Sequence, residues 1–409
     1  MLKVLHVNYS DIIGGASIGV NRFHQALLKR GIDSKLLVCD KSTNDPNVIG
    51  PSSSLELISN QLKISLARFF KRSLMKTKNK ETVTFNYFNT KILNKINQQD
   101  VDIVHLHWLG NEMVSISQLK KINKPVIWSF WDMWPICGAE HHSYDERFIE
   151  GYTKNNRPDH ESGLDLNRYI WNYKKRNLNF DYTITTPSLW FFNIVKKSYL
   201  HKNKKIKHLP LSLDTNLWTP KNKKNSREIF NVEEDKKVLL FGSATSTNER
   251  KGFDFLINLF SEKRFDNCKL LIFGDKPKRL DKLKIESQYI GKVKDIYSLN
   301  ILYSLSDVLL IPSKIELFGQ IGLEASSCGT PCVTFENTGP TDYVDHLKTG
   351  YVAKYLNMDD FAKGIDWILE DNKRYEDISN NCRKHIINNF DDQIISEKLI
   401  EIYNQVKNS

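Results

Sequence analysis

A pair of glutamates marks the stretch of this chain that points most directly to chemistry. Glu316 and Glu324 are separated by seven residues, and Leu317, Phe318 and Gly319 follow the first of them. A strand-like run precedes the pair and a helix-like run follows it, so both carboxylates are predicted near one helix N-terminus. A carboxylate accepts paired hydrogen bonds from sugar or ribose hydroxyls, and the N–H groups of a helix N-terminus face an anion. The loop therefore predicts a site for the hydroxyls and diphosphate of a nucleotide sugar; the alternative is two solvated acids at a helix start.

Two other loops offer partners for such a phosphate. Arg250-Lys251-Gly252 supplies adjacent cations, and a diphosphate needs fixed cationic partners. An ordinary surface lysine is the alternative for Lys251. Near the N-terminus, Gly14-Gly15-Ala16 lets the backbone approach a phosphate closely. This run lacks the G-x-G-x-x-G spacing of a dinucleotide fingerprint, and a plain turn is its alternative.

Tryptophans and histidines gather between residues 105 and 142. Trp108 and Trp134 offer aromatic faces and indole N–H groups that suit sugar rings, and His107 precedes the first of them. For both tryptophans, sugar binding and core packing stay equally open. Asp100-Val101-Asp102 has a form that metal-dependent transferases use, but it precedes a strand rather than ending one, which favours a solvated strand entry. The six cysteines include no Cys-x-x-Cys pair and no neighbouring His/Cys cluster, so no metal site is predicted.

Alternating strands and helices must position these residues. Short apolar runs predict strands at Lys3–Asn8, Ser34–Cys39, Ile103–His107, Val126–Phe130, Tyr182–Thr185, Val238–Phe241, Lys269–Phe273, Tyr289–Ile290, Val308–Ile311 and Pro331–Thr334. Helix-length amphipathic runs separate most of them, which predicts α/β domains with parallel sheets. The lysine-rich stretch Lys221–Arg227, with Leu209-Pro210 before it, is the predicted link between two doubly wound domains. Ligands would lie at the carboxyl ends of the strands, in a cleft that both domains face.

The composition is that of a globular protein. The 409 residues are 40% hydrophobic and 26% charged, which argues against disorder. No apolar run approaches the roughly 18 residues of a membrane helix, and the first residues are typical of a strand rather than of a signal peptide. We therefore expect a cytoplasmic protein. No helix-turn-helix, zinc-finger or RNP pattern appears, so no nucleic-acid partner is expected.

The net charge of +11 is concentrated in local runs. Residues 63–80 carry seven Lys or Arg and no acid, and Leu66, Phe69, Phe70 and Leu74 share one face of a predicted helix. Two interpretations stay open. The helix lies on an anionic membrane surface, or its apolar face packs into the core and its basic back is solvated.

The motif Glu316-x7-Glu324, with Phe318-Gly319 after the first glutamate, resembles that of the family-4 retaining glycosyltransferases with the GT-B fold. Tyr289–Val293 and Leu302–Val308 resemble the segments before that loop, and Gly339–Asp342 resembles the loop after its helix. His107-Trp108 and Trp131–Pro135 resemble a subgroup that builds bacterial surface polysaccharides such as O-antigen, capsule and colanic acid. The resemblance covers most of the chain.

This resemblance implies that the two domains bind different substrates. It implies an acceptor-binding domain over 1–208, a donor-binding domain over 209–385, and a C-terminal helix in 386–409 that packs back on the first domain. Glu324 would hold the ribose, Glu316 the sugar hydroxyls, and Lys251 the diphosphate. The further donor-site residues that it implies are Gly15, Ser243, Arg250, Leu317, Phe318 and Gly319, and the implied acceptor-site residues are His107, Trp108 and Trp134.

Two positions depart from the family pattern. Ser243 stands where an arginine is usual, so Arg250 is expected to substitute for it. Trp131 stands where the family has the histidine of a His-Asp pair, which leaves His107, His141 and His142 as candidates for the missing polar group. Asp132 remains as a catalytic-site carboxylate for an acceptor hydroxyl.

The resemblance thus implies an enzyme, a hexosyl- or N-acetylhexosaminyl-type glycosyltransferase that needs no metal and no cofactor. Its co-substrate would be a nucleotide-diphosphate sugar, with a UDP-sugar favoured, and its acceptor a glycan or lipid-linked sugar of surface polysaccharide or lipopolysaccharide. It would work in the cytoplasm or at the inner face of the plasma membrane. The alternative, suggested by Trp131 and Ser243, is a related binding or scaffold subunit with impaired catalysis. The sequence leaves the base, the sugar and the linkage open.

Overall fold

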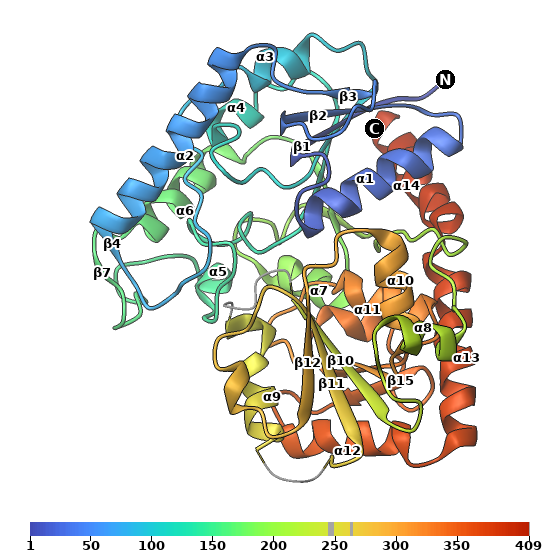
Figure 1. Ribbon diagram of the computed structural model, residues 1–409. Coiled ribbons are helices and arrows are strands. Elements are labelled where there is room, and N and C mark those ends of the chain that lie inside the picture. The colour runs from blue at the N-terminus through green and yellow to red at the C-terminus, as the bar shows by residue number, and fades with distance from the viewer. Residues whose placement is uncertain (244–248, 262–264, 409) are drawn as a thin grey trace. The chain divides into compact units, whose positions relative to one another are not determined.

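The structure is a computed structural model that describes residues 1–243, 249–261 and 265–408. The chain divides into two compact units. The first comprises Met1–Pro210 and a C-terminal segment that begins at Ser396, and the second is Leu211–Ile395. Each unit is built on its own parallel sheet (Figure 1).

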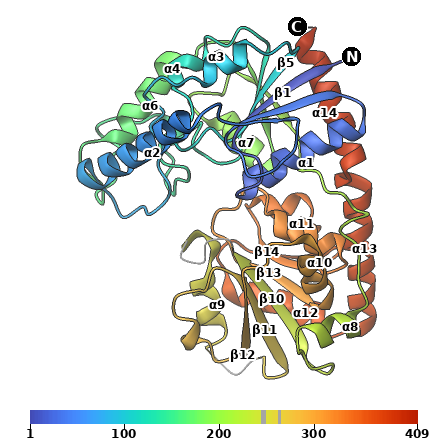
Figure 2. The ribbon, with the colours of Figure 1, turned by 45° about the horizontal axis from the view of Figure 1, so that its top comes forward.

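The first unit contains a sheet of seven strands in the order β3-β2-β1-β5-β6-β8-β9. These strands are β1 (Lys3–Ser10), β2 (Asp33–Asp40), β3 (Val48–Ile49), β5 (Ile103–Leu106), β6 (Val126–Ser129), β8 (Thr183–Thr186) and β9 (Lys205–His208). Figure 2 shows two neighbouring strands of this sheet, β1 and β5. A separate antiparallel pair joins β4 (Met75–Lys76) and β7 (Ser162–Gly163). The helices are α1 (Gly15–Lys29), α2 (Ser54–Leu74), α3 (Ile92–Asn97), α4 (Ile116–Leu119), α5 (Arg147–Glu150), α6 (Leu166–Asn177) and α7 (Leu189–Lys197), with α14 (Asp392–Lys407) from Ser396 onward.

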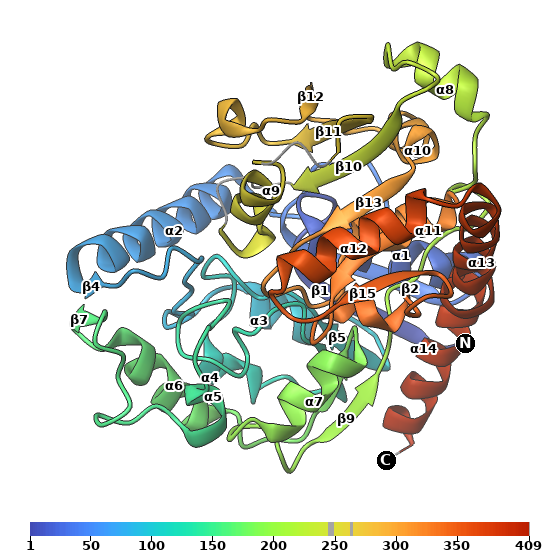
Figure 3. The ribbon, with the colours of Figure 1, turned by 90° about the horizontal axis from the view of Figure 1, so that it is seen from below.

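The second unit contains a sheet of six strands in the order β12-β11-β10-β13-β14-β15, of which Figure 3 shows the first four side by side. The strands are β10 (Lys237–Ser243), β11 (Cys268–Gly274), β12 (Glu286–Gly291), β13 (Val308–Ile311), β14 (Cys332–Phe335) and β15 (Gly350–Ala353). The helices are α8 (Lys223–Ile229), α9 (Phe253–Leu259), α10 (Ile296–Leu305), α11 (Gln320–Ser327), α12 (Met358–Leu369) and α13 (Asn372–Phe390), with short 3₁₀ turns η1 (Glu249–Lys251), η2 (Leu280–Lys282) and η3 (Gly339–Asp342).

Both sheets are parallel throughout and their central strands are buried. Every residue of β5, β6, β13 and β14 is buried, as expected for strands covered on both faces by helices. The predicted α/β class with parallel sheets is confirmed. Three short edge strands, β3, β9 and β15, have no counterpart among the predicted ones, because lysines in β9 and a glycine in β15 conceal the apolar pattern.

Of the predicted link, Leu209-Pro210 lies where the chain divides, whereas Lys221–Arg227 does not. The chain divides after Pro210, and Lys221–Arg227 lies within the second unit and forms most of α8. Its basic residues are held by a buried carboxylate, because Lys223 and Arg227 both bind Asp307, at 2.5 and 2.9 Å. A high content of lysine and arginine in the sequence therefore does not distinguish a solvated linker from a helix whose cations pair with a buried carboxylate.

The basic, amphipathic run lies mostly in α2. Leu66 and Phe69 are 42% and 62% exposed, so the alternative in which this apolar face packs into the core is wrong for these two residues. Ile64 and Ala67 are the buried residues of the helix. Within the described part of the chain, no helix has the length and apolar character needed to cross a membrane.

Candidate functional site

The loop between β13 and α11 is fixed by a second loop around η3. Gly319 precedes α11 with φ 81°, a left-handed conformation that suits glycine. Its carbonyl accepts a hydrogen bond from the Tyr343 hydroxyl at 2.7 Å, and the Glu316 carbonyl accepts one from the Gly339 N–H at 2.6 Å. A Cβ at Gly339 would lie 2.0 Å from the carbonyl oxygen of the residue after Glu316. These contacts hold the backbone of the Glu316–Gly319 loop in one shape at the N-terminus of α11.

Three predicted residues meet at this loop. Lys251 Nζ lies 2.5 Å from Glu316 Oε2, and Arg250 Nη1 lies 3.9 Å from the same oxygen. Arg250 also donates to the carbonyl of Ile315 at 2.7 Å. All three charged side chains are largely buried, with exposures of 21% or less. The arrangement places two cations and one carboxylate at a helix N-terminus, where an anion is favoured.

Close backbone packing brings η1 to the Glu316–Gly319 loop. Gly252 has φ 76°, and a Cβ there would lie 1.9 Å from the carbonyl oxygen of Pro312. The Lys314 N–H donates to the Arg250 carbonyl at 2.8 Å. Because β10 and β13 are neighbouring parallel strands, the residues that follow each strand meet at the same edge of the sheet.

Glu324 is held separately, from within the core. It lies on α11, is 6% exposed, and accepts a hydrogen bond from the Tyr303 hydroxyl at 2.8 Å. Tyr303 is fully buried on α10, against the rings of Phe273 and Trp218. The sequence does not reveal Tyr303 as a partner of Glu324, because a tyrosine in an apolar helix gives no sign of where its hydroxyl points.

The other donor-site residues divide between the units. Ser243 ends β10, is buried, and its carbonyl accepts the Asp275 N–H at 3.1 Å. Leu317 and Phe318 have buried side chains, and Phe318 packs on Tyr343, so a ligand would meet their backbone. Gly15 is the exposed first residue of α1, in the first unit.

In the first unit, Asp132 is the centre of a buried hydrogen-bond network. Its Oδ2 accepts from Trp108 Nε1 at 2.6 Å and lies 2.5 Å from His141 Nδ1, and its Oδ1 accepts the Trp134 N–H at 2.9 Å. Burial alone would raise the pKa of Asp132, but the adjacent His141 holds this pKa below its usual value. His141 Nε2 lies 2.8 Å from the Thr84 hydroxyl. The order Asp-His-Thr has the connectivity of a nucleophile relay, but Thr84 is fully buried and out of a substrate's reach.

Trp134 and His107, two of the predicted acceptor-site residues, are buried in the core. Trp134 is 2% exposed and its indole N–H donates to the Thr84 carbonyl at 2.9 Å. Lys174, which is fully buried, lies 3.8 Å from the Trp134 ring and donates to the carbonyls of Trp134, Cys137 and Gly138. This geometry favours core packing for Trp134. Trp108 is only partly buried and packs edge-on against Tyr9.

His107 belongs to a buried imidazole cluster with His6 and His105, whose ring nitrogens lie within 4.8 Å of one another. Trp131 Nε1 donates to His107 Nδ1 at 3.1 Å, and His107 Nε2 lies 2.8 Å from His6 Nδ1. Because the indole N–H occupies the Nδ1 lone pair, His107 carries its proton on Nε2 and donates it to His6. Metal ligation through that Nε2 would need the opposite tautomer. The cluster therefore fits a hydrogen-bond network better than a metal site, and Trp131 has a structural role in it.

The remaining candidate residues, Asp100, Asp102 and His142, form ion pairs of their own. Asp100 pairs with Lys3 at 2.5 Å and Asp102 with Lys407 at 2.9 Å, at the exposed entry to β5. His142 Nδ1 lies 3.2 Å from Glu81. The Asp-x-Asp sequence is thus bound in surface ion pairs.

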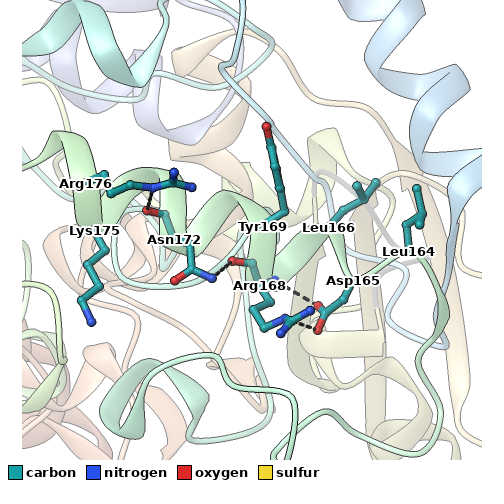
Figure 4. Close-up of a pocket in the computed structure, with 8 residues that line it drawn as sticks. All are labelled: Leu164, Asp165, Leu166, Arg168, Tyr169, Asn172, Lys175 and Arg176. Atoms are coloured by element: carbon teal, nitrogen blue, oxygen red, sulfur yellow. Dashed lines mark hydrogen bonds and ion pairs between the residues drawn. The ribbon is translucent and has the colours of Figure 1, made fainter.

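An open hollow of about 750 Å³ lies on α6 (Figure 4). Arg168 turns back to Asp165, which caps the helix by accepting the Arg168 N–H at 3.0 Å. Lys175, Arg176 and Tyr169 line the remainder. None of the predicted site residues lines this hollow, so we do not place the candidate site there.

Comparison with known proteins links the second unit to one family. Residues 222–385 match the model for "Glycosyl transferases group 1". The match contains the whole Arg250–Lys251–Glu316 cluster and Glu324 with its partner Tyr303.

Curated relatives are similar to the chain over part of their length. The chain is 30% identical over 204 residues to an uncharacterised glycosyltransferase of Methanocaldococcus jannaschii, with 47% of this chain and 51% of the relative aligned. It is 32% identical over 102 residues to the capsular polysaccharide biosynthesis glycosyltransferase CapM of Staphylococcus aureus, with 25% of this chain and 27% of CapM aligned. The chain thus spans about half or less of the length of these relatives.

Solved structures show the fold of the entire chain. Sucrose-phosphate synthase of Thermosynechococcus elongatus matches with a TM-score of 0.71 and 17% identity over 99% of both chains. Anabaena HepE in complex with UDP and glucose matches with a TM-score of 0.65 and 16% identity over 99% of this chain and 100% of HepE. The predicted fold of two Rossmann-like domains, as in GT-B glycosyltransferases, is confirmed.

Proposed function

We propose that the protein is a retaining, metal-independent glycosyltransferase that moves a sugar from a nucleotide-diphosphate sugar to a glycan or lipid-linked acceptor. The observation that carries the proposal is the meeting of Arg250, Lys251 and Glu316 at the N-terminus of α11. Two buried cations beside a helix N-terminus suit a diphosphate, and a buried carboxylate suits sugar hydroxyls.

In the proposed reaction the acceptor hydroxyl oxygen bonds to the anomeric carbon while the bond from that carbon to the diphosphate oxygen breaks. The acceptor proton passes to the departing phosphate oxygen, so no separate base on the protein is needed. Lys251 and Arg250 stabilise the charge that develops on the leaving diphosphate. Glu316 orients the sugar, and Glu324, held by Tyr303, orients the ribose.

We assign the acceptor to the first unit and a positioning role to Asp132. Its oxygens fix the Trp108 indole and the His141 ring, and Trp108 keeps a partly exposed face for a sugar. A UDP-sugar carrying a hexosyl or N-acetylhexosaminyl group is the proposed donor, which the UDP and glucose bound to HepE support. CapM supports a role in bacterial surface polysaccharide synthesis, at the cytoplasmic face of the membrane.

A donor screen tests the proposal. UDP-, GDP-, ADP- and dTDP-sugars are incubated with the protein, with and without EDTA, and nucleotide release and binding are measured. We expect slow release from one donor, unchanged by EDTA and abolished by Glu316→Ala. If donors bind but no nucleotide is released, even when polysaccharide acceptors are added, the result would favour the alternative of a scaffold subunit.

The Tyr303 hydroxyl gives a second test, of ribose binding. Tyr303→Phe removes a hydrogen bond to a buried carboxylate, so we expect the affinity for the nucleoside diphosphate to fall about 10- to 100-fold, with kcat at saturating donor little changed. Calorimetric titration measures the affinity. Tyr289→Phe, which removes a hydroxyl bound to the Gly274 carbonyl in the same unit, is the matched control. Equal affinities for the two variants would contradict a role for Glu324 in binding.

A further inference from the structure

Helix α2 carries an apolar stripe that the protein leaves in solvent. The stripe consists of Leu55, Ile58, Leu62, Leu66 and Phe69, with exposures of 78%, 55%, 64%, 42% and 62%. Spacings of three and four residues place these side chains along one face of the helix. The buried residues Ile64 and Ala67 lie on the opposite face. An exposed stripe of large apolar side chains is unusual for a water-facing helix and indicates a binding surface.

Polar contacts at both ends fix this helix to the first unit. The Ser53 side chain caps its N-terminus, and Glu56 pairs with Lys95 at 2.8 Å. At the other end Lys71 donates to the Glu81 carbonyl at 2.6 Å, and β4 continues from the helix and pairs with β7 (Figure 3). The stripe is thus presented by a helix that is held in place without burying it.

The charges beside the stripe indicate its partner. Lys63 lies beside one edge of the stripe and Arg72 beside the other, as the helical positions require. Arg68 lies nearer the buried face, where it lines a hollow with Ile64 and Ala67. Residues 57–80 contain seven Lys or Arg and no acid. A second copy of the same helix would bring like charges together. An apolar face with basic flanks instead suits the interface of a bilayer that contains anionic lipids.

We propose that α2 docks the protein on an anionic membrane, with the stripe in the interface and Lys63 and Arg72 on lipid phosphates. The helix spans about 30 Å along the bilayer plane at 1.5 Å per residue. Docking involves no residue of the Arg250–Lys251–Glu316 cluster and does not depend on the proposed transferase activity.

Co-sedimentation with vesicles tests the proposal on the full chain. Vesicles of phosphatidylglycerol and phosphatidylcholine are compared with phosphatidylcholine alone. Binding is expected only to the anionic vesicles and is expected to weaken with salt. In the triple variant Ile58→Ser, Leu62→Ser, Phe69→Ser the partition coefficient is expected to fall about 100-fold, and in Lys63→Gln, Arg72→Gln about tenfold to thirtyfold.

A matched control removes exposed apolar side chains elsewhere, with Leu189→Ser, Ile229→Ser and Tyr297→Ser. This variant is expected to bind as the unaltered protein does. Equal loss in the two triple variants, or binding that persists in the stripe variant, would overturn the proposal. If the unaltered protein does not bind vesicles but is a dimer in light scattering, and the stripe variant is a monomer, the stripe would instead be the contact with a second copy.

A site-specific dye gives a readout that does not alter the stripe. All six native cysteines are buried, so Ser59→Cys beside the stripe can be labelled with an environment-sensitive fluorophore. Anionic vesicles should shift its emission to the blue, whereas a dye on Ser287→Cys in the second unit should not respond. An unchanged Ser59 dye in the presence of sedimenting protein would also contradict docking through α2.

Discussion

Replacing Lys251 with alanine is expected to lower kcat/KM for the nucleotide sugar by about 100- to 1,000-fold, the usual cost of one transition-state charge partner. Lys251 is held 2.5 Å from Glu316 at the N-terminus of α11, so its ammonium group is positioned before the donor binds. Steady-state kinetics with the donor found in the screen measure the effect. Lys292→Ala, which removes a lysine that is 64% exposed and pairs with Asp275 in the same unit, should leave kcat/KM unchanged.

The ion pair makes a second comparison informative. Lys251→Ala leaves Glu316 with Arg250 at 3.9 Å as its nearby cation, whereas the double variant Lys251→Ala, Glu316→Ala removes both charges. Since both residues serve one bound donor, their effects on kcat/KM should be far from additive. Additive losses, or a Lys251→Ala enzyme within threefold of the unaltered one, would contradict a shared donor site.

The family resemblance placed Arg250, Lys251 and Glu316 in one site, and the topology explains why they meet. Neighbouring parallel strands end at one edge of a sheet, so residues after β10 and residues after β13 must meet there, whatever the intervening chain does. The glycines that allow the meeting, Gly252 and Gly319, were visible in the sequence as well. The expectation that Arg250 takes the place of the arginine missing at Ser243 stays a prediction, although the structure does place Arg250 beside Lys251 and Glu316.

The first unit was harder to predict because its side chains are placed by partners far away in the sequence. Trp134 is packed by Thr84 and Lys174, which lie 50 residues before it and 40 after it. Trp131 donates to His107, so the residue that departs from the family pattern completes a buried network. For α2 the periodicity correctly gave an apolar face, but no pattern within one helix says whether that face meets the core or solvent.

Acid is expected to unfold the first unit well before the second. Burial lowers the pKa of His105 to about 3 and that of His201 to about 4, and it also lowers the pKa of His6, His24 and His107. All five belong to the first unit. In the unfolded chain each titrates near 6.5, so below that pH the unfolded state binds more protons and the stability falls with falling pH.

The size of this effect follows from the number of histidines. A histidine contributes a loss of up to about 1.4 kcal/mol per pH unit between its unfolded and folded pKa values. His105 and His201 together therefore cost roughly 2–3 kcal/mol per unit from about pH 6 to pH 4, and the lowered pKa values of His6, His24 and His107 add to this loss. A loss of this size between pH 6 and pH 4 removes a large share of a typical domain stability of about 5–15 kcal/mol. The stabilisation is complete above pH 6.5 and lost progressively toward pH 4, a window set by the histidines rather than by carboxylates.

Calorimetry can count the protons directly, without a variant that fails to fold. Unfolding of the first unit at pH 5.5, followed in buffers of different ionisation enthalpy, should take up at least about two protons, one each for His105 and His201, since an unfolded histidine is then mostly charged. An uptake of one proton or fewer would show that these imidazoles are charged in the folded protein. In that case the hydrogen-bond chain from Trp131 through His107 to His6 could not have the tautomers assigned here, because a protonated His107 would have no lone pair for the indole.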